Sequence, residues 1–149
     1  MISKILVASD GSDVAWKAVE YAADLAKQTG AVLTILSVAE EDSFISASVP
    51  EVITPTHLRE TMEDYLRQVA EAIIRKGEEL CQRKGVPTKR VIRYGRPSEE
   101  IVKEAEESKA DLIVMGSHGK GYLKAALIGS VTFGVMNKET KVPVLVVRK

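Results

Sequence analysis

The sequence predicts a single doubly wound α/β domain over residues 1–149, with a five-stranded parallel sheet covered by helices on both faces. Three observations support this prediction. Five short runs rich in Val, Ile and Leu alternate with helical segments along the chain, an order typical of parallel strands joined by right-handed crossovers. The runs are almost continuously apolar, as expected of strands buried on both faces. No linker, repeat or low-complexity tract divides the 149 residues, a usual length for one domain.

The first third of the chain predicts two strands around one helix. Ser3–Ser9 is a buried strand, and Asp10–Ser12 turns the chain. The serine of that turn can cap a helix whose apolar positions recur at helical spacing until Gly30. A second buried strand is expected over Ala31–Val38. Glu40–Thr56 shows no clear period and contains two prolines, so we expect a long loop, which in a compact domain is usually functional or disordered.

A long amphipathic helix is predicted next, because six apolar residues share one face. They are Leu58, Met62, Leu66, Val69, Ile73 and Leu80. We interpret this face as core or partner contact rather than cofactor contact. A less apolar strand near a sheet edge is expected over Thr88–Arg93, and a helix over Pro97–Ser108. A buried strand over Asp111–Met115, a helix from about Ser130 and a last strand over Val142–Val147 follow.

The most informative motif follows the Asp111–Met115 strand. It reads Gly116-Ser117-His118-Gly119, then nine residues, then Gly129-Ser130. Glycines three apart let the backbone adopt positive φ and approach a ligand without a Cβ in the way. The second glycine lies where a helix begins, and backbone N–H groups are unpaired there. Because ligands of doubly wound sheets lie beyond the carboxyl ends of the strands, the motif predicts a cradle for a nucleotide phosphate.

These segments together resemble the nucleotide-binding branch of the universal stress protein family. The resemblance covers the whole chain and includes Ile5–Ser12, the Gly95-Arg96-Pro97 turn, Ala110–Ser117, the ungapped Gly-x2-Gly-x9-Gly-Ser motif and Val142–Val147. It implies a Rossmann-like fold of the adenine nucleotide alpha hydrolase type. It also implies an ATP-binding protein of the stress response that forms a homodimer through Val142–Val147.

The resemblance also implies site residues. Phosphate contacts would come from the motif glycines and Ser130, a ribose or metal contact from Asp10, and an adenine contact from the backbone of Val38. The candidate ligand-binding residues are Asp10, Val38, Met115, Gly116, Ser117, His118, Gly119, Gly129, Ser130 and Val131. Asp10 could hold Mg²⁺ or Mn²⁺ through water, or serve only the electrostatics of the helix start. Ser130 could contact phosphate or cap its helix, and Lys120 and Lys124 could neutralise phosphate or remain solvated.

The composition argues against several classes of binding partner and location. Lys plus Arg and Asp plus Glu both total 21, which argues against nucleic-acid binding driven by overall charge. Cys81 is the only cysteine, which fits a reducing cytoplasm. The N-terminus lacks the pattern of a signal peptide, and no apolar stretch approaches membrane-spanning length. We therefore expect a cytoplasmic protein that binds neither nucleic acid nor membrane.

The sequence favours a regulator over a dedicated enzyme. It has no P-loop spacing, no nucleophile–His–acid constellation and no Cys/His cluster. We expect at most slow ATP hydrolysis. Two alternatives stay open. Ser9–Asp13 is similar to the first loop of ATP pyrophosphatases, without its double glycine, so an adenylyl-transfer enzyme is one alternative. A structural dimer that binds no nucleotide is the other.

Overall fold

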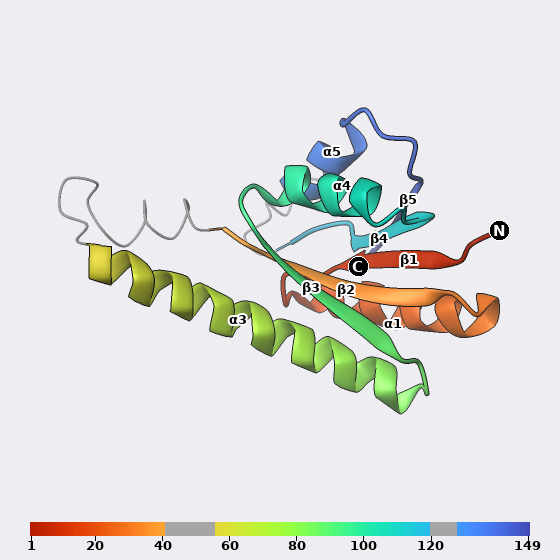
Figure 1. Cartoon of the computed structure of the whole chain (residues 1–149). Coiled ribbons are helices and arrows are strands. Elements are labelled where there is room, and N and C mark those ends of the chain that lie inside the picture. Colours follow the sequence, from red (N-terminus) through yellow and green to blue (C-terminus); the bar gives the residue numbers. More distant parts are fainter. Residues whose placement is uncertain (41–55, 120–127) are drawn as a thin grey trace.

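The computed structural model describes residues 1–40, 56–119 and 128–149 (Figure 1). The elements are, in order, β1 Lys4–Ala8, α1 Asp13–Thr29, β2 Val32–Ala39, α3 Thr56–Arg83, β3 Thr88–Tyr94, α4 Pro97–Glu107, β4 Leu112–Gly116, α5 Ser130–Met136 and β5 Val144–Val147. The predicted order is confirmed, and most predicted ends shift by a residue or two. The predicted loop between Glu40 and Thr56 and the two flanking lysines, Lys120 and Lys124, lie outside the described residues.

The five strands form one parallel sheet in the order β3-β2-β1-β4-β5. The chain winds from β1 outward to β3, then returns to β4 beside β1 and continues to β5. The winding direction therefore reverses between β1 and β4, and the predicted doubly wound fold is confirmed. β3 lies at one edge, as predicted, and none of its residues is fully buried. β5 lies at the other edge.

Helices cover both faces of the sheet. α1 and α3 lie on one face, α4 and α5 on the other (Figure 1). Successive side chains of a strand point to opposite faces: Ile5 and Val7 of β1 join the core under α1 and α3, while Leu6 joins the core under α4 and α5. Because each strand supplies two cores, its sequence is apolar at consecutive positions.

The ends of α1 follow the predicted capping. Ser12 is the N-cap, and its hydroxyl accepts a hydrogen bond from the amide of Ala15 at 3.2 Å. Gly30 ends the helix with φ 74°, and its amide donates to the carbonyl of Ala26 at 2.8 Å. The Ser12 cap fixes the direction in which the chain leaves β1, and so positions Asp10 at the carboxyl end of the sheet.

The face that α3 turns to the sheet differs from the predicted one. Its buried residues are Met62, Ala70, Ile74, Gly77 and Cys81. Of the predicted face, Met62 is buried, Leu66, Ile73 and Leu80 are half-buried, Val69 is 37% exposed, and the side chain of Leu58 is not described. The sheet contact uses small residues because α3 lies close to β2. A Cβ on Gly77 would lie 3.1 Å from Cδ1 of Ile35.

Cys81 sits in this buried face of α3. Burial raises the pKa of its thiol to about 11, with a smaller lowering by Lys84 and a smaller raising by Glu78. The thiol therefore stays protonated at neutral pH, and a protonated thiol is a poor nucleophile.

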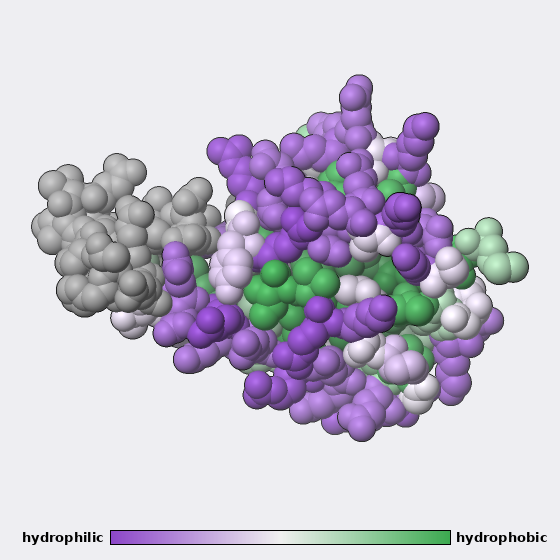
Figure 2. All heavy atoms as spheres, in the orientation of Figure 1, coloured by the Kyte–Doolittle hydropathy of each residue, from purple (hydrophilic) through white to green (hydrophobic). Residues whose placement is uncertain are grey.

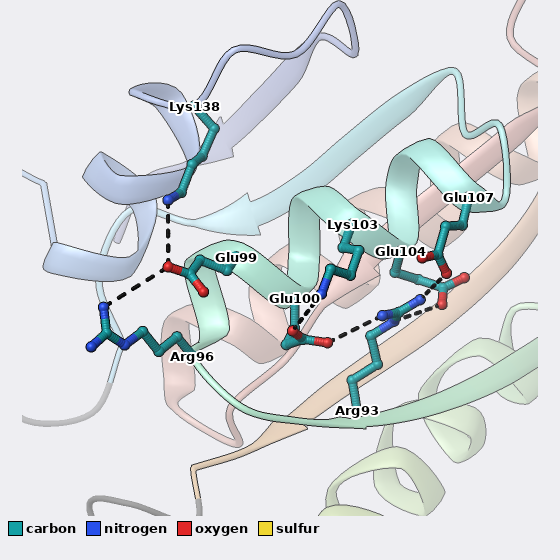
Figure 3. A network of polar contacts seen from close by, with 8 residues as sticks. All are labelled: Arg93, Arg96, Glu99, Glu100, Lys103, Glu104, Glu107 and Lys138. Carbon is teal, nitrogen blue, oxygen red and sulfur yellow. Dashed lines mark hydrogen bonds and ion pairs between the residues drawn. The ribbon is translucent and has the colours of Figure 1, made fainter.

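Two groups of polar contacts join elements of the fold: one joins the starts of β1 and β4, and the other joins β3 to α4. At the amino end, the Asp111 carboxylate accepts from the amides of Ser3 and Lys4 and from the Ser3 hydroxyl, each at 2.9 Å, and these bonds hold the pKa of Asp111 below its ordinary value. At the β3 edge, Arg93 is paired with Glu100, Glu104 and Glu107 of α4 (Figure 3).

The surface around β3 is mixed. Hydrophobic side chains gather in a band between α3 and α4, whereas hydrophilic side chains cover both helices (Figure 2). β3 carries three basic residues, Lys89, Arg90 and Arg93, as is common on edge strands. Within the described ranges, no helix is long and apolar enough to cross a bilayer.

Candidate nucleotide-binding site

A cleft of about 600 Å³ opens at the carboxyl end of the sheet, where the winding direction reverses. The carboxyl ends of β1, β2 and β4 line it, together with the start of α5 and residues of α3 and α4. Its lining residues are 8–10, 15, 36–40, 66, 69, 70, 73, 97, 101, 115, 116, 118, 119 and 129–132. The volume lies within the range of small-ligand sites, and the position is the one that a doubly wound sheet favours for a ligand.

The two halves of the glycine motif lie against each other in this cleft. The amide of Gly129 donates to the carbonyl of Ser117 at 2.7 Å. The buried hydroxyl of Thr132 donates to the carbonyl of Gly116 at 2.8 Å. These bonds join the loop after β4 to the first turn of α5 across nine intervening residues.

The motif glycines are required by close approach rather than by backbone conformation. None of Gly116, Gly119 and Gly129 has φ in the left-handed region, so the expectation of positive φ is wrong. A Cβ on Gly119 would lie 2.4 Å from Oδ2 of Asp10, and one on Gly116 would lie 2.7 Å from Cγ1 of Val14. A Cβ on Gly129 would lie 3.1 Å from the Cα of His118. Each glycine thus lets two segments of the chain approach closely.

The first backbone N–H groups of α5 lie at the cleft. Gly129 is the N-cap and makes no side-chain capping bond. Ser130 is therefore the first helical residue, and its interpretation as a cap is wrong. The first amides of a helix have no partner within the helix, and Ser130, Val131 and Thr132 all line the cleft.

Asp10 stands between the loop and α1. Its Oδ1 accepts from the amide of Ser12 at 2.9 Å, and its Oδ2 lies beside Gly119. Within the described ranges, no group of three or more His, Cys, Asp or Glu side chains could hold a metal ion. One carboxylate is nonetheless enough for Mg²⁺ when phosphates and water supply the other ligands. Asp10 therefore fits a nucleotide-bound Mg²⁺.

Nine of the ten predicted site residues line the cleft, and Ser117 does not. Ser117 is 3% exposed. Its amide donates to the carbonyl of Val147 at 2.8 Å, and its hydroxyl lies 3.0 Å from Nδ1 of His118. Ser117 thus lies beneath the loop, and its hydroxyl is within hydrogen-bonding distance of the His118 ring.

Sequence reasoning missed the lining residues that α3 and α4 contribute. Leu66, Val69, Ala70 and Ile73 of α3 line the cleft, together with Pro97 and Ile101 of α4. Polar lining residues were also missed, namely Ser9, Ser37 and Thr132. The sequence does show that the apolar face of α3 is wider than packing on the sheet requires. Periodicity alone, however, does not distinguish residues that pack in the core from residues that line a cleft.

Comparison with known protein families matches residues 1–148 to the Universal stress protein family. The chain belongs to this family. Universal stress protein YxiE of Bacillus subtilis is 36% identical over 99% of this chain and 100% of its own length. The solved structure of MJ0577, a universal stress protein of Methanocaldococcus jannaschii, superposes with a TM-score of 0.84 at 32% identity, covering 100% of this chain and 97% of that one.

A further universal stress protein has been solved in complex with cAMP. It superposes with a TM-score of 0.69 at 25% identity, covering 99% of this chain and 97% of its own. Family membership and the α/β fold predicted from the sequence are therefore confirmed for this universal stress protein, and a structural neighbour binds a nucleotide.

Proposed function

We propose that residues 1–149 of this universal stress protein act as one unit that binds ATP with Mg²⁺ in the cleft, and that the bound nucleotide regulates a homodimer in the stress response. One observation carries the proposal: Gly119 packs against Asp10 so closely that a Cβ would lie 2.4 Å from its carboxylate, and Gly129 packs tightly against His118, at the position where doubly wound sheets bind phosphates. The neighbour solved with cAMP supports the ligand class.

Main-chain amides would hold the phosphates. In the described part of the chain, no Lys or Arg lines the cleft, whereas Asp10 and Glu40 do. A bare triphosphate would be repelled by these carboxylates, and a divalent cation would remove that repulsion. The proposed ligand is therefore the magnesium complex, with Asp10 on the metal side.

Titration calorimetry tests this proposal. We expect ATP affinity to fall about tenfold or more when Mg²⁺ is chelated, since one charge-assisted contact corresponds to about a factor of ten. Asp10→Asn keeps an oxygen for the Ser12 amide but loses the charge, so its ATP affinity should change much less between the two conditions. No measurable binding of ATP to the wild type, with Mg²⁺ at millimolar concentration, would remove the proposal.

We propose regulation with at most slow hydrolysis. The candidate nucleophile beside His118 is the hydroxyl of Ser117, but Ser117 is buried beneath the loop and does not line the cleft. A nucleophile must reach the substrate to act. A bound nucleotide would instead shift the conformation of the loops around it through its different affinity for two states.

The proposed dimer joins copies through β5. The carbonyl of Pro143 accepts a hydrogen bond from the amide of Ile113 in β4 at 2.9 Å, and the carbonyl of Val147 accepts one from the amide of Ser117, just after β4, at 2.8 Å. Because backbone groups alternate in direction along a strand, the N–H and C=O of Val144 and Val146 point away from β4. In the described part of the chain no strand lies on that side of β5, and such an edge pairs readily with another chain.

Val146→Pro tests the dimer without disturbing the bonds between β4 and β5. Proline lacks an N–H, so the outer edge loses a donor, while the inner edge keeps its bonds. We expect a dimer for the wild type and a monomer for the variant in sedimentation velocity at micromolar concentration, with the same far-UV circular dichroism. A wild type that sediments as a monomer would contradict the proposed dimer.

A further inference from the structure

Two large apolar side chains are exposed on the outer side of α5. Phe133 is 57% exposed and Met136 is 44% exposed, and residues three apart on a helix are neighbours on its surface. The inner side of the same helix packs in the core, where Val131 and Val135 lie with Val144 of β5. Core packing therefore does not explain the outer pair. We name Phe133 and Met136 the α5 outer face.

The α5 outer face lies on the β5 side of the molecule. α4 packs on β2 and β3, and α5 lies beside α4 (Figure 1), where its Thr132 bonds the end of β4. Gly134 faces α4, since a Cβ on it would lie 2.8 Å from the Cβ of Ser98. Met136 lies about 200° further around the helix, and Phe133 about 60° from Met136. The pair therefore projects away from α4, toward the side of the β5 edge.

A dimer through β5 needs more surface than β5 alone offers. β5 has four residues, Val144–Val147. A stable interface buries about 800 Å² on each partner and uses about 20–30 residues a side, so surfaces next to the strand must contribute. The α5 outer face continues from this edge and is apolar and exposed. A second copy fits it, because a two-fold interface joins the same patch of both chains.

The same short helix also borders the cleft. Residues 129–132, which are the N-cap and the first turn of α5, line the cleft, whereas Phe133 and Met136 do not. Phe133 follows Ser130 by three residues and Met136 follows it by six, a rise of about 5 and 9 Å along the helix axis. One helical segment thus reaches from the cleft to the surface beside β5.

α5 depends on its surroundings for its order. It has seven residues, including Gly134. Isolated helices of this length are not stable in water, and an interior glycine is unfavourable. The contacts that hold α5 include the Thr132 bond to the carbonyl of Gly116 at 2.8 Å and the Lys138–Glu99 pair at 3.8 Å (Figure 3). Contacts from a nucleotide to residues 129–132 would add to these and hold α5 more firmly.

We propose that α5 couples the cleft to the dimer: a nucleotide bound at the first turn of α5 fixes the α5 outer face where a second copy contacts it, and so strengthens the dimer. This inference rests on the proposed nucleotide-binding dimer and adds the element that connects its two properties. A surface that is ordered beforehand loses less entropy on association. Because coupling between two binding equilibria is reciprocal, dimerisation also raises the affinity for the nucleotide.

Sedimentation velocity of the full chain over a concentration series, without ligand and with saturating ATP and Mg²⁺, tests the coupling. The nucleotide should lower the dimer dissociation constant of the wild type about tenfold, a usual size for such coupling. The double variant Phe133→Gln/Met136→Gln removes apolar surface but keeps a good helix former at each position. With nucleotide, its dimer dissociation constant should be about tenfold higher than that of the wild type, and its response to nucleotide should fall below about twofold.

Tyr94→Gln is the matched control. Tyr94 is 44% exposed, like Met136, but it belongs to β3 at the opposite edge of the sheet and does not line the cleft. This variant should dimerise and respond to ATP like the wild type, and urea unfolding shows that each variant is folded.

Two results would overturn the inference and leave nucleotide binding and the β5 dimer standing. One is a wild-type dimer that binds ATP without becoming tighter. The other is a double variant that dimerises as tightly as the wild type or keeps its full response to ATP. A wild type that binds no ATP in calorimetry, or that stays monomeric at every concentration, would overturn the proposed function as well.

Discussion

Gly119→Ala is expected to lower the affinity for Mg²⁺–ATP by about a hundredfold or more, the equivalent of two charge-assisted hydrogen bonds. The new Cβ would lie 2.4 Å from Oδ2 of Asp10. Either the loop or the carboxylate must move, and each is a proposed part of the cradle. Calorimetry measures the loss. The fold should persist, since the Cβ would meet only the end of one partly exposed side chain.

A double-mutant cycle with Asp10→Ala tests the cause. If the collision with Asp10 produces the loss, Gly119→Ala should cost much less in the Asp10→Ala background than in the wild type. Wild-type ATP affinity in a folded Gly119→Ala protein would remove the glycine loop from the site. Gly116 is less suitable for this test, because its Cβ would lie 2.7 Å from Val14 in the core and would disturb the fold.

Arg93→Met is expected to destabilise the fold by about 2–3 kcal/mol, because it removes the guanidinium that two partly buried carboxylates share. Arg93 is 18% exposed, and its guanidinium pairs with Glu100 at 3.1 Å and Glu104 at 3.0 Å, which are 14% and 13% exposed (Figure 3). Burial alone would lower the pKa of Arg93, but its hydrogen bonds to Glu104, Glu100 and Glu107 hold that pKa above its ordinary value.

Urea unfolding measures this effect, and Arg96→Met is its control. Arg96 is 79% exposed and lies 3.9 Å from Glu99 (Figure 3), so its loss should change stability by less than about 1 kcal/mol. Equal stability of Arg93→Met and wild type would show that the network contributes nothing. Since α4 carries Pro97 and Ile101 into the cleft, the network also fastens one side of the site to the sheet.

The sequence by itself determined the order of the elements and the glycine-loop residues of the cleft. Continuous apolar runs identify strands buried on both faces, and the Gly-x2-Gly-x9-Gly-Ser spacing identifies the loop and helix start that the fold brings together. Both signals are local: they depend on nearest neighbours along the chain and on the few conformations those residues permit. Ser12 and Gly30 were predictable for the same reason.

Only the tertiary structure decided which apolar residues became core and which became site. Leu66, Val69 and Ile73 share a helical face that periodicity assigns to packing, yet the close approach of α3 to β2 is made by Ala70 and Gly77. The reason that Gly119 must be glycine is likewise tertiary, because Asp10, more than a hundred residues earlier, occupies the space of its side chain. Distances between segments far apart in sequence are set by packing, and no local pattern contains them.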